Sequence, residues 1–379
     1  MLINIEDVFL PRGDFNTRNT YISRRRYEEE LKNCLQVRTN IFISGESGTG
    51  KTWLYEIFFN KEAINFVTIN LAEVSMYDSL FYLLEKNILE NISGKRKDEI
   101  LESCYDKITK NNSKPSYIVF DNLEHLADDI LKRELISLLH NLDNSSYSKY
   151  NVRIMLVGIP NSLKDFFANM NILFEPIANR IREIPKLNGF EKSELLNFLD
   201  QTLIGKLLLN LTKTNLEDIF NYIASVTDLI PLRVQQYLLY LSKEIFDNNK
   251  VFSKELFSKA SKKWIQSHYS ELEITFDEYF LPLTGKIQKR NQLIFLLGKI
   301  SKDSLFTNKQ LSDMYSKHFP NSVKSSINIS QILAALMKGN QPLIVKMSKD
   351  KYRLRDSRMR ILINSKLAID SKEIVYSDG

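Results

Sequence analysis

The chain has 379 residues, of which 43% are hydrophobic and 26% charged, a composition that suits two or three packed domains and excludes a disordered chain. No apolar run approaches the roughly 20 residues of a membrane helix, and the N-terminal stretch lacks the basic and apolar segments of a signal peptide. The only two cysteines, Cys34 and Cys104, are too few for a zinc site or a disulfide framework. We therefore expect a cytoplasmic protein.

The net charge of +6 is unevenly distributed along the chain. Between Lys286 and Arg360 there are 16 basic and four acidic residues, a net charge of +12, so the remainder carries −6. A basic C-terminal module attached to an acidic body is typical of proteins that bind nucleic acid.

The first two-thirds of the chain alternate short apolar runs with amphipathic stretches. This alternation predicts an α/β fold, residues 1–188, whose mostly parallel sheet is covered by helices on both faces. The expected strands are residues 40–44, 65–70, 117–120, 153–159 and 182–187, and the clearest helices between them are 79–92 and 128–142.

A phosphate-binding motif, GESGTGKT, follows the first expected strand and opens a helix. Its glycines let successive backbone N–H groups turn inward around phosphates, and the helix N-terminus favours negative charge. Lys51 would contact the β- and γ-phosphates, and the Thr52 hydroxyl would bind Mg²⁺. The expected ATP-binding residues of the loop are Gly45, Ser47, Gly48, Thr49, Gly50, Lys51 and Thr52. The third expected strand ends on Asp121, whose carboxylate would bind the same Mg²⁺ directly or through water.

Residues 189–283 predict a helical lid and linker, and residues 284–379 predict three helices followed by a hairpin, the order of a winged helix. The third helix would enter the major groove of double-stranded DNA, and the hairpin would lie along phosphates. That helix is poor in arginine and glutamine, so a module that docks on the nucleotide-binding domain as a latch remains the alternative. The expected DNA contacts are Lys324, Lys338, Lys349, Lys351, Arg353 and Arg355.

Together these motifs resemble the AAA+ ATPases of the origin-recognition type, their STAND signalling relatives and transposition-regulator ATPases. The resemblance covers nearly the whole chain, from YISRRRYEEELKNCL to KYRLRDSRMRILI. It implies that Ile22 lies near the adenine and that Asn161 is a polar sensor of the γ-phosphate or the attacking water. It also implies an arginine finger, Arg180 before Arg182, and a second sensor, Arg233, in a lid helix.

These implied roles have alternatives. Asn161 also suits the cap of the following helix, and Arg180 and Arg182 also suit the solvated end of a helix. A positive charge at Arg233, near a helix start, is disfavoured by the helix dipole unless a phosphate lies opposite. An arginine finger acts in a neighbour's site, so it implies an oligomer or filament with ATP at the subunit interfaces.

The resemblance breaks after the magnesium aspartate, where the family places a glutamate and this sequence has Asn122. An asparagine orients water but cannot accept its proton. Glu124, expected at the start of the next helix, either replaces that base or only supports the first helical turn. Because phosphoryl transfer depends mainly on positioning and charge neutralisation, hydrolysis is expected to be slow.

The resulting hypothesis is a slow AAA+ ATPase switch, in a replication, transposition or defence setting, whose nucleotide state controls assembly and DNA engagement. The alternative is an ATP-gated signalling scaffold whose winged helix does not bind DNA and which acts through a partner effector protein. No metal-ligand spacing joins His125, His140, His268 and His318.

Overall fold

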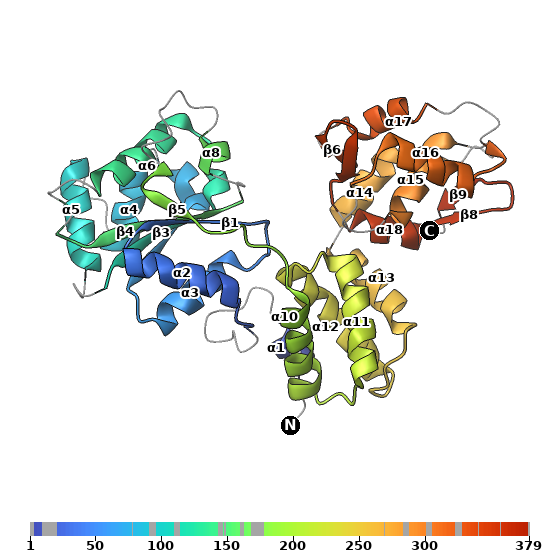
Figure 1. The fold of residues 1–379 in the computed structure, drawn as a ribbon, viewed down its shortest axis with the longest axis horizontal. Coiled ribbons are helices and arrows are strands. Elements are labelled where there is room, and N and C mark those ends of the chain that lie inside the picture. Colours follow the sequence, from blue (N-terminus) through green and yellow to red (C-terminus); the bar gives the residue numbers. More distant parts are fainter. Residues whose placement is uncertain are drawn as a thin grey trace. The chain divides into compact units, whose positions relative to one another are not determined.

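The computed structural model consists of two compact units, an α/β unit, Gly13–Gly189, and a helical unit made of Met1–Arg12 and Phe190–Gly379 (Figure 1). The division into three domains stays a prediction. None of the described helices is long and apolar enough to cross a membrane. The structure describes residues 4–9, 21–77, 79–90, 96–109, 114–142, 147, 149–159, 163–167, 178–268, 270–282, 288–300, 305–322, 328–339, 341–356 and 358–377.

The α/β unit contains a parallel five-stranded sheet in the order β2-β3-β4-β1-β5, which confirms the predicted fold class. The last strand ends at Glu183 and is shorter than predicted, because its regular pairing with β1 stops after Ile184, and the next donor to β1 is Leu187 rather than Lys186. The backbone of Leu187 nevertheless donates to the Ser44 carbonyl at 2.7 Å. The strands are β1 Asn40–Ser44, β2 Phe66–Asn70, β3 Ser116–Asp121, β4 Val152–Gly158 and β5 Ile181–Glu183.

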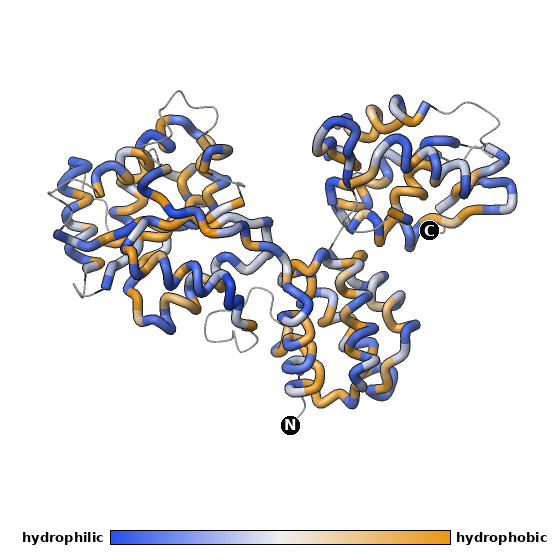
Figure 2. Tube along the Cα trace, viewed as in Figure 1, coloured by the Kyte–Doolittle hydropathy of each residue, from blue (hydrophilic) through white to orange (hydrophobic). Residues whose placement is uncertain are grey.

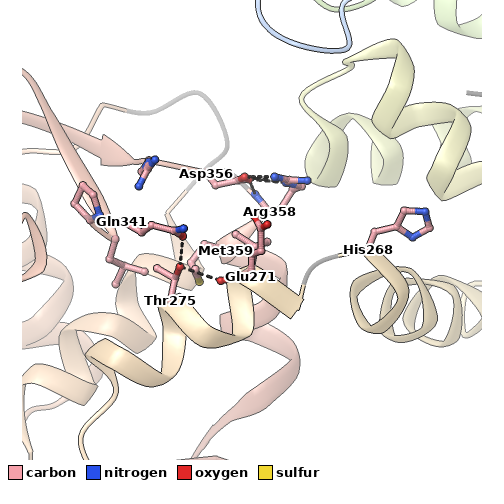
Figure 3. Close-up of a pocket in the computed structure, with 11 residues that line it drawn as sticks. His268, Glu271, Thr275, Gln341, Asp356, Arg358 and Met359 are labelled. Atoms are coloured by element: carbon pink, nitrogen blue, oxygen red, sulfur yellow. Dashed lines mark hydrogen bonds and ion pairs between the residues drawn. The ribbon is translucent and has the colours of Figure 1, made fainter. Parts of the chain in front are cut away.

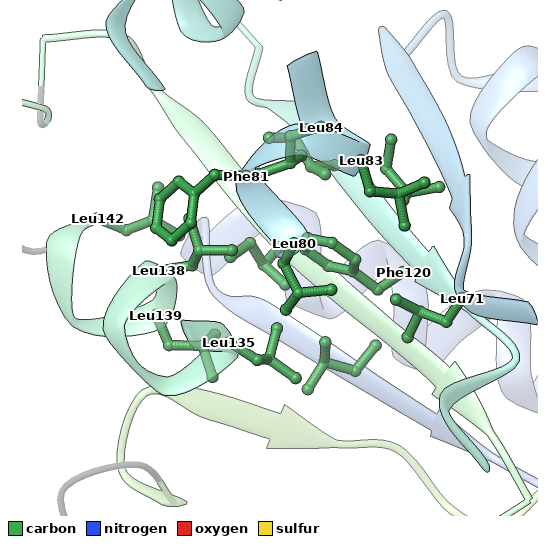
Figure 4. Packing of buried hydrophobic residues seen from close by; sticks show 14 of the residues in the cluster. Leu71, Leu80, Phe81, Leu83, Leu84, Phe120, Leu135, Leu138, Leu139 and Leu142 are labelled. Atoms are coloured by element: carbon green, nitrogen blue, oxygen red, sulfur yellow. The ribbon is translucent and has the colours of Figure 1, made fainter. Parts of the chain in front are cut away.

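Helices cover both faces of this sheet, because successive strand side chains point to opposite faces. Ile41 and Ile43 pack in one hydrophobic cluster, with α2 and α3, whereas Phe42 lies in the cluster on the other face. In that second cluster Phe120 of β3 packs among leucines of α4 and α6 (Figure 4). Figure 2 shows the hydrophobic residues of the unit gathered along its strands. The helices are α2 Arg25–Val37, α3 Lys51–Lys61, α4 Leu80–Leu89, α5 Lys97–Ile108 and α6 Asp129–Asn141.

The first part of the helical unit is a set of packed helices around the buried Trp264 and Tyr237. The short α1, Ile5–Val8, lies against α12 although the two are far apart in sequence. A π-helical segment, Asp200–Lys206, continues α10. The helices of this part are α10 Lys192–Leu199, α11 Lys213–Thr227, α12 Pro231–Asp247 and α13 Leu256–His268.

The C-terminal part of the unit contains the predicted three helices followed by a hairpin, and its assignment as a winged helix stays a prediction. The third helix, α17, is shorter than predicted, and Lys338 lies beyond its last residue, Leu336. Lys324 lies outside the described residues. The elements are α14 Ser270–Tyr279, α15 Lys289–Lys299, α16 Asn308–His318, α17 Ile329–Leu336, β6 Ile344–Ser348, β7 Lys351–Leu354, α18 Met359–Lys366, β8 Leu367–Ile369 and β9 Val375–Ser377.

Candidate nucleotide-binding site

The phosphate loop joins the end of β1 to the start of α3. Gly48 and Gly50 adopt positive φ angles of 82° and 88°, a backbone conformation that glycine adopts without steric cost. A Cβ atom on Gly45 would lie 2.7 Å from the Leu187 carbonyl oxygen, so this position also excludes a side chain. The local geometry therefore explains the three glycines of the motif.

Lys51 is the first residue of α3 and its ammonium group lies against the loop. Its Nζ donates to the carbonyl oxygens of Gly45 at 2.9 Å and Glu46 at 3.1 Å. Burial lowers the pKa of Lys51, and the negative charges of Glu124 and Asp121 act against that shift. A positive charge is thus held at the loop by two nearby carboxylates.

Thr52 and Asp121 meet at the carboxyl end of the sheet. The Thr52 hydroxyl donates to Asp121 Oδ2 at 2.8 Å, and Asp121 is only 6% exposed at the tip of β3. A hydroxyl and a carboxylate are the hard oxygen ligands that Mg²⁺ prefers. The chemistry of this pair therefore fits a magnesium ion.

Asn122 directly follows Asp121 and has a left-handed backbone with a φ of 63°, which asparagine tolerates better than most residues. Its backbone N–H donates to Asp121 Oδ1 at 2.8 Å, and its Nδ2 donates to Asn70 Oδ1 at 2.7 Å. The sequence reasoning missed Asn70. The position of Asn70 at the end of the neighbouring strand could have indicated it as a site residue, because Asn70 pairs in register with Asp121.

Glu124 does not begin the next helix, so the expectation that it supports a first helical turn is wrong. It lies in a separate 3₁₀ turn, Leu123–His125, whereas α6 begins at Asp129 with Asp128 as its cap. Glu124 Oε2 instead accepts the backbone N–H of Ile159 at 3.1 Å. Its carboxylate is therefore held beside the end of β4, and its negative charge partly opposes the lowering of the Lys51 pKa by burial.

The segment before α2 contains Ile22, which is buried with 6% exposure. Two residues later, Arg24 donates from Nη2 to the carbonyls of Asn188 at 2.9 Å and Gly189 at 3.1 Å. Tyr27 adds a hydroxyl bond to the Lys186 carbonyl at 3.1 Å. These contacts fix the segment expected to carry the adenine contact onto the last residues of the α/β unit. Sequence reasoning missed Arg24, because its partners lie over 160 residues away.

Replacing Arg24 by methionine is expected to destabilise the α/β unit by about 1–2 kcal/mol, because the buried Arg24 side chain loses its hydrogen bonds to two partly buried carbonyls. Urea unfolding followed by circular dichroism measures the change. The neighbouring exposed Arg25→Met is the matched control, since it removes the same charge without a buried bond. Equal unfolding midpoints for the two variants would contradict this role of Arg24.

Two other expected site residues lie near β5. The backbone carbonyl of Arg180, just before the strand, accepts Asn40 Nδ2 at 3.1 Å. Arg182 pairs with Glu30 at 3.0 Å, with its side chain 41% exposed. Both arginines therefore lie towards the start of β5, where it pairs with the start of β1. Asn161 lies outside the described residues, so neither its sensor nor its capping role can be placed.

Arg233 belongs to the helical unit, in the first turn of α12 as predicted. Its Nη1 pairs with Asp228 Oδ2 at 2.7 Å, and its side chain is 17% exposed. Burial raises the pKa of Asp356, but hydrogen bonds and charge from Arg358, with the charge of Arg233, outweigh it and lower the pKa overall. The predicted sensor thus has carboxylate neighbours within its own unit.

The described candidates for DNA contact are exposed. Lys349, Lys351 and Arg353 belong to the hairpin of β6 and β7. Arg355 follows the hairpin and lines a pocket of about 280 Å³. In that pocket the guanidinium of Arg358 contacts both carboxylate oxygens of Asp356 (Figure 3).

Comparison with known proteins identifies the α/β unit. Residues 35–167 match the family model of the AAA domain. This part of the chain is therefore similar to AAA domains. The matched residues include the phosphate loop, Asp121 and Glu124. A search of curated proteins found no match.

Solved structures extend the likeness beyond the AAA+ domain. A Walker-type ATPase of Pyrococcus abyssi is 17% identical with a TM-score of 0.55, over 94% of this chain and 99% of that one. The ORC2 protein of Aeropyrum pernix, solved as ADPNP–ADP complexes, is 16% identical with a TM-score of 0.54, over 94% and 96% of the two chains. The fold is therefore similar to that of these two proteins along nearly the whole chain.

Proposed function

We propose that this protein is an ATP-dependent switch that binds ATP with Mg²⁺, hydrolyses it slowly and assembles with copies of itself according to its nucleotide state. The observation that carries the proposal is the contact of Thr52 with Asp121 at 2.8 Å beside Lys51, followed by an asparagine in place of a base. The nucleotides in the Aeropyrum pernix ORC2 structure support ATP as the ligand.

The chemical roles follow from the residues present. Lys51 would neutralise phosphate charge, and Thr52 and Asp121 would hold Mg²⁺, which supplies further charge neutralisation when bound. The Asn122 amide can orient a water but cannot remove its proton. Glu124 is the nearby carboxylate left for that step, and the Ile159 N–H holds it beside β4. Slow hydrolysis follows, because positioning is retained while the usual adjacent base is absent.

Self-association is supported by the place of Arg180. The phosphate loop follows the carboxyl end of β1, whereas Arg180 precedes β5, next to the amino end of β1. The five residues of β1 separate the two ends by about 16 Å. An arginine placed there suits the site of a second copy better than its own, so ATP would lie between subunits of an oligomer or filament.

DNA engagement is proposed from the charge of the C-terminal module. The hairpin places Lys349, Lys351 and Arg353 on an exposed surface. The exposed side chains of α17 are uncharged, namely Ser330, Gln331 and Ala334. A surface of this kind favours contacts to phosphates over readout of bases, and so weak sequence preference.

The uncharged exposed side of α17 also favours a second candidate, the ATP-gated signalling scaffold. In that case the C-terminal module would contact protein, as a latch on the nucleotide-binding domain, and a partner effector protein would carry the output. The two candidates differ in what the basic hairpin does, because only a DNA contact makes ATP turnover depend on duplex DNA and salt.

ATP turnover by the full chain, with and without duplex DNA at low and moderate salt, tests the proposal. We expect slow turnover that rises with DNA at low salt, because neutralised phosphates release counterions. The double variant Lys351→Ala/Arg353→Ala is expected to lose this rise, and Glu124→Gln to lose turnover. Lys372→Ala, an exposed lysine of the same module away from the hairpin, is the matched control.

The contrary results are equally specific. ATP binding with negligible turnover that ignores DNA would remove the DNA proposal and leave a nucleotide-locked switch. A hairpin variant that hydrolyses ATP faster than the wild type without DNA would indicate the latch of the signalling scaffold.

A further inference from the structure

Tyr55 is a buried residue of α3, one turn after Thr52 on the same side of the helix. Its side chain is fully buried, and its ring packs near Phe59 and Phe66. The hydroxyl reaches Asp121 Oδ2 at 3.0 Å and Thr68 Oγ1 at 3.4 Å. A tyrosine that fills a core therefore places its one polar atom on the magnesium-site aspartate.

The direction of these hydrogen bonds follows from the donors available. An ionised carboxylate only accepts, so the single hydroxyl hydrogen of Tyr55 points to Asp121 and Thr68 donates to Tyr55. A tyrosine hydroxyl is ordinarily neutral below a pH of about 10, so it can act as this donor throughout the working pH range.

The acceptor sites of Asp121 can be counted. Oδ2 receives two donors from α3, the hydroxyls of Thr52 and Tyr55, at 2.8 Å and 3.0 Å. Oδ1 receives the backbone N–H of Asn122 at 2.8 Å. A carboxylate offers about four acceptor sites, so among the described residues three are used and one, on Oδ1, remains.

We propose that Tyr55 is a positioning residue for the magnesium site, an inference that rests on the proposed Mg²⁺–ATP binding. With Thr52 it fixes the Asp121 carboxylate to the helix that carries the phosphate loop, and it leaves one Oδ1 acceptor site for Mg²⁺ or a metal-bound water. Without the hydroxyl, Asp121 keeps its charge but loses one of the two bonds that fix its orientation, so Mg²⁺ binds a less preorganised ligand.

Tyr55→Phe tests this inference, because it removes the hydroxyl and keeps the ring. The readout is the affinity of the full chain for a fluorescent ATP analogue, titrated with Mg²⁺ and repeated with EDTA. In EDTA, Tyr55→Phe is expected to bind the analogue as tightly as the wild type does. With Mg²⁺, half of the metal-dependent gain in affinity should require a roughly tenfold higher Mg²⁺ concentration, because the charged Asp121 carboxylate has lost a hydrogen bond.

Tyr117→Phe is the matched control. Tyr117 is also fully buried, packs against Phe59 and donates its hydroxyl to the Thr39 carbonyl at 3.1 Å, with no contact to Asp121. It should lose similar stability yet keep the wild-type Mg²⁺ requirement. A double-mutant cycle adds a second measurement, because Tyr55→Phe should change nothing further in an Asp121→Asn background.

The outcomes separate this inference from the proposed function. A wild-type ATP affinity that ignores Mg²⁺ overturns the proposed magnesium site and the role of Tyr55 with it. If the wild-type affinity responds to Mg²⁺ but Tyr55→Phe needs the same or a lower Mg²⁺ concentration, the role of Tyr55 alone is overturned. Equal shifts in Tyr55→Phe and Tyr117→Phe, or additive effects with Asp121→Asn, also overturn it.

Discussion

Replacing Lys51 by alanine is expected to lower ATP turnover by about a hundredfold or more, because a preorganised positive charge at a developing negative charge is usually worth that much. The Lys51 ammonium lies on the carbonyls of Gly45 and Glu46 inside the phosphate loop. ATP affinity should fall as well, since the lysine is expected to contact ground-state phosphates. Turnover and analogue binding by the purified chain measure both effects.

Lys61→Ala is the matched control for this variant. Lys61 is the last residue of the same helix and is exposed. Lys61→Ala should leave turnover unchanged. That result would show that the effect of Lys51→Ala comes from the lost phosphate contact and not from a lost positive charge or an unfolded α3. Turnover in Lys51→Ala within threefold of the wild type would mean that hydrolysis occurs elsewhere, and the assignment of the loop would fail.

Much of the α/β unit is predictable from the sequence, because its determinants are local. A strand, a glycine-rich loop and a helix occur in direct succession around Lys51, and a run of apolar residues ends on Asp121. The five strands were found from apolar runs alone, since a parallel sheet is buried on both faces.

The rest of the site depends on contacts between distant segments. Asn70 and Tyr55 acquire their roles only when β2 and α3 meet the end of β3, although both occupy positions that strand ends and helical spacing could have suggested. Glu124 was placed wrongly because a 3₁₀ turn and a separate helix look like one helix in sequence. The partners of Arg24 lie across the domain, and no local pattern indicates them.

Glu373→Gln is expected to destabilise the helical unit by roughly 2 kcal/mol, because it leaves buried donors poorly satisfied. Glu373 is 5% exposed, in the turn between β8 and β9. Its Oε1 accepts the Asn321 N–H at 2.8 Å, and its Oε2 accepts the N–H and hydroxyl of Ser322 at 2.8 Å and 2.6 Å. An amide presents one N–H₂ group to a donor, so at least one bond is lost. Urea unfolding followed by circular dichroism measures the loss.

Because the Glu373 carboxylate is ionisable, the difference in stability between the wild type and Glu373→Gln depends on pH. Burial opposes ionisation of Glu373, but the hydrogen bonds donated by Ser322 and Asn321 outweigh it and lower its pKa below the ordinary value. Its contribution is therefore complete above the pKa of about 4.3 in the unfolded chain, and it disappears as the pH falls through the lower folded pKa. The difference in stability between the wild type and Glu373→Gln should be full at pH 7 and shrink below about pH 4.

The control is Asp313→Asn in α16, which removes an exposed carboxylate of the same module and should show no such difference in stability. A gap that stays constant with pH would show that packing, not the ionised carboxylate, fixes this turn.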